Sequence, residues 1–334
     1  MKAVAQDRYG GREVLDLREL SEPVCGPGEV RVAVRAAALN PSDWNIRAGH
    51  ARLLVPYAFP LVLGSDFSGV VIEVGADSTD WKLGDEVFGA ADPRRLGTLA
   101  ETICVRADLI AAKPAALSHT EAAALPVVGQ TAWRALFEEL RLQSTDRLLV
   151  LGGGGAVGSL AVQLGFRAGA EVLATARPRS FASVEAQGVH EVLDASDPAR
   201  FSSHGEFDAI FDTVGAPERV RALRALRAGG RLVSIAGVPT GRGARAHGVS
   251  PPIRVLFDLL SAREYGRAAL RRGEYRYFFV DPSGARMREL ARACGDDGVR
   301  APVDSVFELA EFAAAFHRLE TGRLTGKVVL SIGD

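Results

Sequence analysis

The chain has 334 residues, of which 47% are hydrophobic and 24% are charged, and its formal net charge is -1. This length favours two hydrophobic cores, and the composition is that of a globular protein and excludes a disordered one. A nearly neutral chain has no general electrostatic attraction to nucleic acid or to an anionic membrane, so we expect neither as a partner. The three cysteines are odd in number and far apart in the sequence, which argues against a disulfide framework or a zinc knuckle. Residues 1–11 have no apolar run, so we expect no secretory signal and a cytoplasmic protein.

The first hundred residues have β character, as in the alternating segment Val30–Ala38 and the β-branched run Val70–Val74. From about Thr120 the pattern changes, and strands then alternate with helices. The expected strands are Arg147–Leu151, Glu171–Thr175, His190–Leu193, Ala209–Asp212 and Arg231–Ala236. The expected helices between them are Val157–Ala168, Ser180–Gln187 and Pro217–Arg227. Such alternation predicts an α/β fold with a doubly wound parallel sheet.

A basic segment of about 241–275 follows this alternation. Ser250 and the two prolines after it suit the start of a helix, and Gly273 suits its end. Its arginines favour either a solvated helix face or a lid over a substrate cleft. After it we expect a strand at Arg276–Val280, and then a helix and a last strand at Leu309–Glu320 and Lys327–Ile332.

The strongest local signal is LLVLGGGGAVGSLAVQLG, which begins at Leu148. Gly153, Gly155 and Gly158 form G-x-G-x-x-G, and Gly152 offers an alternative first glycine. Such a turn needs unrestricted φ, room for a pyrophosphate and a helix close to the strand. The helix that starts near Ala156 would direct free N–H groups at the phosphates. A glycine-rich turn with no ligand is the alternative reading.

The end of the next strand distinguishes NADP from NAD. NAD sites place an acidic residue there, about 20 residues beyond the turn, to bind the ribose hydroxyl groups. Here the sequence reads ATARPRS, so that Thr175 is followed by Arg177, Arg179 and Ser180 and there is no acid. Guanidinium groups match a 2′-phosphate, which predicts NADPH (NADP+) as the cofactor. Two merely solvated arginines are the alternative.

With this turn in view, the chain resembles the zinc-independent NADPH:quinone oxidoreductases of the medium-chain dehydrogenase/reductase superfamily. The resemblance runs nearly end to end. It rests on the blocks GPGEVRVAVRAAALNPSDWNIRAG, LVLGSDFSGVVIEVG, KLGDEVFG, EAAALPVVGQTAW, the glycine turn, FDTVG, RALRAGGRLVSIAG, YFFV and GRLTGKVVL. So many blocks in order are specific for the superfamily and much less specific for the substrate.

The resemblance implies a GroES-like catalytic domain at 1–121, completed by 281–334. It also implies a Rossmann NADP-binding domain at 122–280, which contains the basic helical insertion. A homodimer is implied too, since many relatives pair the last Rossmann strand, here near Tyr277–Val280, across a two-fold axis.

The resemblance further implies individual site residues. The catalytic residues would be Asn40, Asp43, Ser65 and Thr131, and the substrate contacts Trp44, Tyr57 and Phe67. The cofactor contacts would be Gly152, Gly153, Gly155, Ala156, Val157, Gly158, Thr175, Arg177, Arg179, Ser180, Val214, Gly215, Ala236, Gly237, Phe278, Phe279, Val280 and Lys327. Trp44 would either form an aromatic wall beside a flat acceptor or simply pack in the core. Asp43 is expected to form a turn or to support other site residues without touching the substrate, rather than to act as a general acid.

The sequence departs from the zinc-dependent relatives. They place Cys and His where this chain has Leu39–Asn40 and Ser65–Asp66, and they carry a four-cysteine lobe that is missing here. We therefore expect no metal. Without a metal to polarise a carbonyl, a conjugated acceptor is favoured, because the charge left by hydride transfer is delocalised. Quinone reduction, C=C reduction of an enone or enoyl thioester, and a non-catalytic NADPH-binding role remain open.

Overall fold

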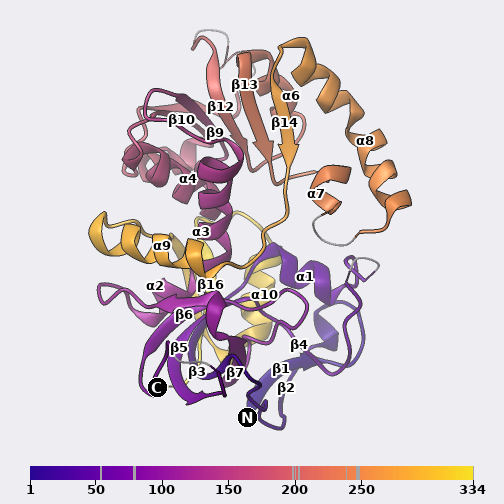
Figure 1. Cartoon of the computed structure of the whole chain (residues 1–334), viewed down its shortest axis with the longest axis vertical. Coiled ribbons are helices and arrows are strands. Elements are labelled where there is room, and N and C mark those ends of the chain that lie inside the picture. The colour runs from indigo at the N-terminus through magenta and orange to yellow at the C-terminus, as the bar shows by residue number, and fades with distance from the viewer. Residues whose placement is uncertain are drawn as a thin grey trace. The chain divides into compact units, whose positions relative to one another are not determined.

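The computed structural model describes residues 1–52, 55–77, 80–197, 199, 201, 204–237, 239–245 and 249–333. The chain forms two compact units (Figure 1). The N/C unit comprises Met1–Gln130 and Asp281–Asp334, and the central unit comprises Thr131–Val280. The expected first boundary at 121–122 lies inside the N/C unit, and the chain crosses between units within helix α3 (Pro126–Trp133).

The N/C unit is built from two sheets. The larger has the order β15-β16-β3-β5-β6-β8, with β7 also paired to β3, and the smaller has the order β2-β1-β4. The last strand runs antiparallel to β3, so both ends of the chain contribute to one sheet. The strands are β1 (Lys2–Gln6), β2 (Asp16–Glu19), β3 (Glu29–Ala38), β4 (Leu61–Val62), β5 (Asp66–Val74), β6 (Glu86–Ala90), β7 (Thr102–Arg106), β8 (Ile110–Ala112), β15 (Val303–Glu308) and β16 (Lys327–Ser331).

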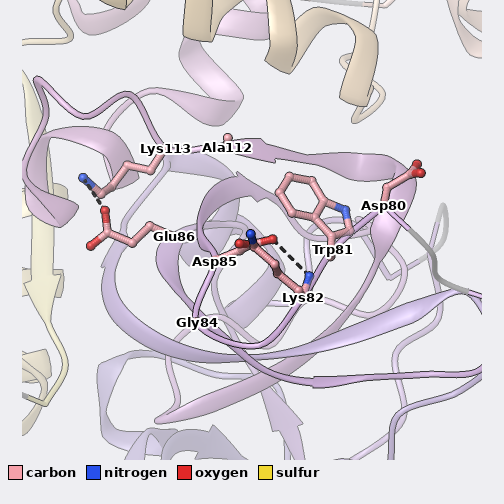
Figure 2. A pocket seen from close by; sticks show the side chains of 8 residues that line it. All are labelled: Asp80, Trp81, Lys82, Gly84, Asp85, Glu86, Ala112 and Lys113. Atoms are coloured by element: carbon pink, nitrogen blue, oxygen red, sulfur yellow. Dashed lines mark hydrogen bonds and ion pairs between the residues drawn. The ribbon is translucent and has the colours of Figure 1, made fainter.

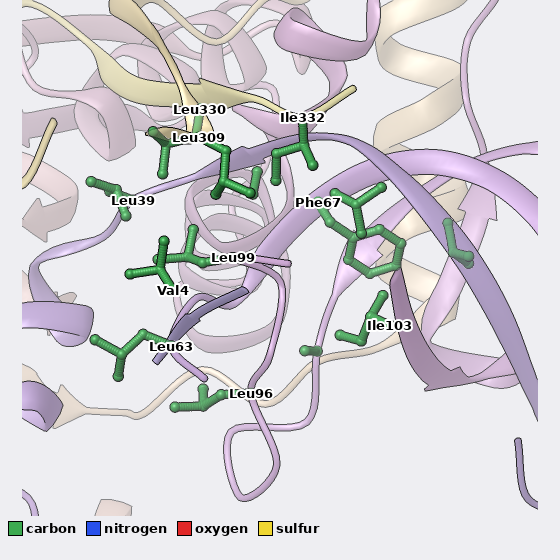
Figure 3. Close-up of a cluster of buried hydrophobic side chains, with 14 of the residues drawn as sticks. Val4, Leu39, Leu63, Phe67, Leu96, Leu99, Ile103, Leu309, Leu330 and Ile332 are labelled. Carbon is green, nitrogen blue, oxygen red and sulfur yellow. The ribbon is translucent and has the colours of Figure 1, made fainter. Parts of the chain in front are cut away.

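Apolar residues from both chain ends form the core of this unit. Val30, Val32 and Val34 alternate inward along β3, as a half-buried strand requires. Figure 3 shows Phe67, Leu99 and neighbouring aliphatic side chains of this core. The helices of the unit are α1 (Pro41–Arg47), α2 (His119–Ala123), the first part of α3, α9 (Gly284–Asp296) and α10 (Phe312–Glu320).

The central unit has a six-stranded parallel sheet in the order β11-β10-β9-β12-β13-β14. Its central strands β9 and β12 are almost entirely buried, because helices cover both faces of such a sheet. The strands are β9 (Arg147–Leu151), β10 (Glu171–Ala176), β11 (Glu191–Asp194), β12 (Phe207–Asp212), β13 (Leu226–Ser234) and β14 (Glu274–Tyr277). The helices are α4 (Ala156–Arg167), α5 (Phe181–Glu185), α6 (Glu218–Ala222), α7 (Gly241–Arg245) and α8 (Pro251–Leu270), with a π-helical turn at Arg134–Glu139.

The basic segment differs in detail from the expectation. Its helix begins at Pro251 as expected, but the Ser250 side chain makes no capping hydrogen bond. The strand after it is Glu274–Tyr277 and not Arg276–Val280, because its parallel partner β13 ends opposite Tyr277, at Ser234. Residues 246–248 of the expected insertion lie outside the described residues. Within the described part of the chain, no helix is long and apolar enough to cross a bilayer.

Candidate active site

The glycine turn follows β9 and is held by the end of β10. The Gly152 N–H donates to the Thr175 hydroxyl at 3.0 Å, and the Gly153 N–H donates to the Thr175 carbonyl at 2.9 Å. Gly152 has a φ of 88°, in the left-handed region that favours glycine. Thr175, an expected cofactor contact, is therefore a buried residue that shapes the turn.

Helix α4 starts where the turn ends. A Cβ at Gly158 would lie 2.1 Å from the Gly152 carbonyl oxygen, so only glycine lets the helix approach the strand this closely. The first intrahelical bond is donated by Ser159 to Gly155, which leaves the N–H groups of Ala156 and Val157 without helical acceptors. Because the strand order reverses between β9 and β12, this helix start lies where parallel sheets of this kind bind ligands. The turn has the geometry of a diphosphate site.

Two arginines follow β10 directly. Arg177 and Arg179 are both exposed, and within the described part of the chain neither guanidinium has an ion-pair partner. Ser180 lies against the glycine turn, since a Cβ at Gly154 would lie 2.9 Å from the Ser180 Cβ. Two unneutralised cations therefore lie beside the turn, which suits an additional phosphate on the adenosine ribose.

The next two strand ends carry the residues that were expected to flank a nicotinamide. The N–H groups of Val214 and Gly215 both donate to Asp212 Oδ1, at 3.0 and 2.7 Å. Ala236 packs against this segment, because a Cβ at Gly215 would lie 3.5 Å from the Ala236 Cβ. Gly237 has a φ of 95°. Asp212 was not among the expected site residues, although it is the last residue of the expected strand Ala209–Asp212.

The end of β14 is packed against the π-helical turn. Phe278 is 3% exposed, and the Arg134 guanidinium lies 4.9 Å above its ring centroid. The same guanidinium donates to the Phe279 carbonyl at 2.9 Å. Phe279 and Val280 are half-buried, and Thr131, on α3, is 4% exposed.

In the N/C unit, the catalytic candidate Asn40 is part of a buried ionic cluster. The Lys327 ammonium donates to Asp66 Oδ2 at 2.9 Å and also to Asn40 Oδ1. The Asn40 Nδ2 donates to the same Asp66 oxygen at 3.0 Å. The other Asp66 oxygen accepts the Val127 N–H at 2.8 Å. Lys327 was expected to contact the cofactor, but its ammonium is engaged inside this cluster.

Asp43 adjoins this cluster through its hydrogen bond with Asn40. It is fully buried, and burial raises its pKa to about 7 against the opposing effects of the Asn40 N–H and Lys327. Its Oδ2 accepts the Asn40 N–H at 2.6 Å, whereas its Oδ1 has no hydrogen-bond partner among the described residues. A carboxyl in this state holds and releases a proton near neutral pH.

The other expected site residues of the N/C unit differ in their burial and in their contacts. Ser65 is 9% exposed and directly precedes β5. Phe67 is fully buried in the apolar core, so its ring has no surface to offer an acceptor. The Tyr57 hydroxyl donates to the Pro93 carbonyl at 2.7 Å, and burial raises the pKa of Tyr57 to about 12. Trp44 is half-buried, packs edge-on against His50, and lines a cavity of about 380 Å³.

A larger cavity, of about 640 Å³, contains none of the expected site residues. Figure 2 shows two interactions among its lining residues: an ion pair between Lys113 and Glu86 at 3.1 Å, and a hydrogen bond from the backbone N–H of Lys82 to the Asp85 carboxylate at 3.0 Å. Among the described residues, no group of three or more His, Cys, Asp or Glu side chains is arranged to hold a metal ion.

A parallel sheet with a glycine turn at its switch point defines a dinucleotide-binding fold. Comparison with known proteins agrees. Residues 26–115 match the family described as alcohol dehydrogenase GroES-like domain, and residues 187–330 match the family described as zinc-binding dehydrogenase.

Individual relatives cover the whole chain. NAD(P)H oxidoreductase RTN4IP1, mitochondrial, of Danio rerio is 32% identical over 99% of this chain and 91% of its own length. The 2-methylene-furan-3-one reductase of Solanum lycopersicum is 32% identical over 99% of this chain and 79% of its own length. The solved quinone oxidoreductase of Coxiella burnetii superposes with a TM-score of 0.86 at 28% identity, covering 100% of this chain and 99% of that one.

The chain therefore belongs to the medium-chain dehydrogenase/reductase superfamily, in its zinc-independent quinone oxidoreductase type, and is an oxidoreductase that uses a nicotinamide dinucleotide. The expectation of a cytoplasmic protein is wrong, because relatives from several organisms carry names that place them in mitochondria. The expectation rested partly on cysteine usage, which distinguishes oxidising from reducing surroundings and not one reducing compartment from another.

Proposed function

We propose that the protein transfers a hydride from NADPH to a conjugated carbonyl acceptor, either a quinone or an enone, without a catalytic metal. The observation that carries the choice of NADPH is the pair Arg177 and Arg179, exposed and without ion-pair partners beside the glycine turn. A 2′-phosphate on the ribose would supply the missing counter-charge, which NADH lacks.

The described residues fit such a cofactor. The turn has room for a diphosphate because Gly155 carries no side chain, and α4 directs unpaired N–H groups outward at its start. The segments that end at Gly215 and Gly237 would receive the nicotinamide. When bound, NADPH supplies a hydride from C4 of its nicotinamide ring.

A metal is not needed at the Asn40 cluster. The positions where zinc-dependent relatives carry Cys and His read Leu39–Asn40 and Ser65–Asp66 here. Asn40 and Asp66 both already accept hydrogen bonds from the Lys327 ammonium. The oxygen atoms that could bind a metal are thus already bound to a buried ammonium group. Neither residue offers the thiolate or imidazole that zinc favours.

The chain's own residues would then orient the acceptor and hold a proton near it. The Asn40 amide has a fixed orientation, since its Oδ1 accepts from Lys327 and its Nδ2 donates to Asp66. One Nδ2 hydrogen remains for an acceptor oxygen on which negative charge grows. Ser65 and Thr131 are further hydroxyl donors. Asp43, with a pKa of about 7, retains a proton in a large fraction of molecules at neutral pH.

The test is to follow NADPH absorbance with purified protein and a panel of quinones, enones and enoyl thioesters, and to repeat it with NADH. We expect oxidation of NADPH by at least one conjugated acceptor and a higher kcat/KM for NADPH than for NADH. Equal constants for the two cofactors would contradict the role of the arginines. Tight NADPH binding with no turnover on any acceptor would contradict hydride transfer.

Of these two acceptors, an enone reduced at its activated C=C bond is the second candidate. It is favoured by similarity to the Solanum lycopersicum reductase and to an Arabidopsis thaliana protein named NADPH-dependent alkenal/one oxidoreductase, which is 30% identical over 99% of this chain. Product analysis decides between the two, since a quinone yields a hydroquinone and an enone yields a saturated ketone.

We further propose that the protein is a homodimer joined through β14. This strand is an edge of the central sheet and is paired with β13 on one side only among the described residues. An edge strand exposes N–H and C=O groups that a second copy satisfies. Light scattering should give twice the 35.4 kDa mass of one chain, and a stable monomer would refute the proposal.

A further inference from the structure

A buried arginine joins three segments of the central unit. Arg219, on α6, is 4% exposed. One of its terminal nitrogens donates to Asp212 Oδ2 at 3.2 Å and to the Ala236 carbonyl at 2.8 Å. The other donates to Glu264 Oε1, on α8, at 3.4 Å. The Ser234 hydroxyl also donates to Asp212 Oδ2, at 2.7 Å.

Asp212 relays this contact to the backbone. The same carboxylate whose Oδ2 binds Arg219 uses Oδ1 to accept the N–H groups of Val214 and Gly215. Arg219 also packs against the following segment, since a Cβ at Gly237 would lie 3.1 Å from its guanidinium. Two loops that belong to adjacent strands, 213–215 and 236–237, are thus held by one guanidinium.

These loops are continuous with the glycine turn. The Thr213 hydroxyl donates to the Leu151 carbonyl at 2.7 Å. A Cβ at Gly152 would lie 2.6 Å from that hydroxyl and 2.8 Å from a Val214 methyl. A shift of the 213–215 loop would therefore displace the glycine turn and the strand ends between which a nicotinamide would lie.

We propose that Arg219 is a positioning residue for the nicotinamide half of the bound cofactor, and that Glu264 ties this function to helix α8. The inference rests on the proposed function, because it assumes that NADPH binds at these strand ends. This inference assigns the basic insertion a role in positioning the cofactor, which differs from the two expectations of a solvated helix face and a lid. α8 lies against β14 (Figure 1). Its Glu264 carboxylate accepts a hydrogen bond from Arg219, which in turn binds the 213–215 and 236–237 loops.

The chemistry of the side chain explains why arginine stands here. A guanidinium has donors on a planar fork and reaches Asp212, Ala236 and Glu264 at the same time, whereas an ammonium is a single point of charge. The fully buried Asp212 and the half-buried Glu264 both face this one cation, so its removal leaves the negative charge of Asp212 uncompensated in the interior. Arg219→Lys therefore keeps the charge and loses the geometry.

The experiment compares two ligands on the intact protein. NADPH spans the whole site, whereas adenosine 2′,5′-bisphosphate occupies only the adenosine half. For Arg219→Lys we expect the Kd for NADPH to rise on the order of tenfold while the Kd for the bisphosphate changes less than about twofold. The kcat with the best acceptor should fall by up to about 10²-fold, the effect of misplacing a reacting group by about 1 Å.

Arg147→Lys is the matched control. Arg147 is also hydrogen-bonded through its guanidinium, to Glu171 at 2.7 Å and to the His204 carbonyl at 2.7 Å. It is, however, the first residue of β9, so it lies at the amino ends of the strands and not at the carboxyl ends where the cofactor would bind. It should lower the melting temperature without changing the ratio of the two Kd values. If Arg219→Lys changed the melting temperature alone, as the control does, Arg219 would be merely structural.

Glu264 keeps the proposal testable if Arg219 variants do not fold. Glu264→Ala should raise the NADPH Kd selectively, and Glu264→Gln, which retains the accepting oxygen, should restore much of the loss. An unchanged ratio of Kd values in every folded variant overturns the inference while leaving the proposed function intact. A wild-type protein that binds neither ligand overturns both.

Discussion

The Lys327 ammonium donates a 2.9 Å hydrogen bond to the Asp66 carboxylate, although 261 residues separate them in the sequence. Lys327 begins the last strand and Asp66 begins β5, so the contact fastens one end of the chain to the sheet formed by the other. Both side chains are buried, and Asn40 supplies further hydrogen bonds to each. A buried ion pair is tolerated only with such additional partners.

Removing one partner of this pair should be strongly destabilising. Lys327→Met leaves Asp66 buried and unpaired, which typically costs about 3–5 kcal/mol. The double variant Lys327→Met/Asp66→Asn should be closer to wild type, because no uncompensated charge remains. Urea unfolding of the wild type, Lys327→Met, Asp66→Asn and the double variant, followed by tryptophan fluorescence, gives the double-mutant cycle. The exposed pair Arg106–Asp108 is the control, and its disruption should cost about 0–1 kcal/mol.

The buried carboxyl of Asp43 predicts a pH dependence of stability. Its pKa is about 7 in the folded protein, against an ordinary value of 3.8. Between these values the folded state binds more protons than the unfolded state, so the free energy of unfolding falls as pH rises. The slope from this group is up to about 1.4 kcal/mol per pH unit between about pH 4 and pH 7.

Asp43→Asn should remove this slope, because an amide does not titrate and its oxygen still accepts the Asn40 N–H. Stability curves at pH 5, 6 and 7 are the measurement, with all other carboxyls common to both proteins. If the two proteins showed parallel pH profiles, Asp43 would not be the titrating group.

The glycine turn predicts two separable effects. Gly158→Ala would place a Cβ 2.1 Å from the Gly152 oxygen, so the helix must shift, at a cost of roughly 1–3 kcal/mol and with loss of NADPH binding. Gly155→Ala meets that oxygen only at 3.5 Å, an ordinary contact, so it should fold normally and still weaken NADPH binding by obstructing the diphosphate.

Gly266, on the exposed side of α8, is the control for these substitutions. It has nothing within 4 Å of an added Cβ, so Gly266→Ala should raise stability by roughly 0.5–1 kcal/mol and leave the NADPH Kd unchanged. Calorimetric titration with NADPH measures the Kd of each of the three variants, and urea unfolding measures the stability of each. Normal NADPH affinity in Gly155→Ala would argue against a diphosphate at this turn.

The arginines after β10 predict cofactor selectivity. Each charge-assisted contact to a phosphate contributes about 1.5–3 kcal/mol, so Arg177→Ala or Arg179→Ala should raise the NADPH Kd by roughly 10- to 150-fold. The NADH Kd should not change, because NADH has no 2′-phosphate. Arg224, another exposed arginine of the central unit, provides the control. A parallel loss of NADH affinity would show that the substitutions damage the site in general.

Local features of the sequence were sufficient for the central unit's framework. Strand β9 was expected with the bounds that it has, and the start of α8 was located by its two prolines. The bounds of β14 were not predicted correctly, because they depend on where its neighbour β13 ends. The GroES-like and Rossmann classes are confirmed by the family matches and by the solved relative.

The sequence by itself determined the glycine turn, the alternation of strands and helices, and the basic pair after β10, because φ preferences, periodicity and charge are properties of neighbouring residues. Only the tertiary structure decided that Phe67 faces the core, since the first four residues of β5 are all buried and show no alternation that would identify a face. Tertiary structure alone also brought Lys327 to Asp66 and Arg219 to Asp212 and Glu264. Those partners come from separate elements, and no local pattern specifies which distant charge a buried side chain will meet.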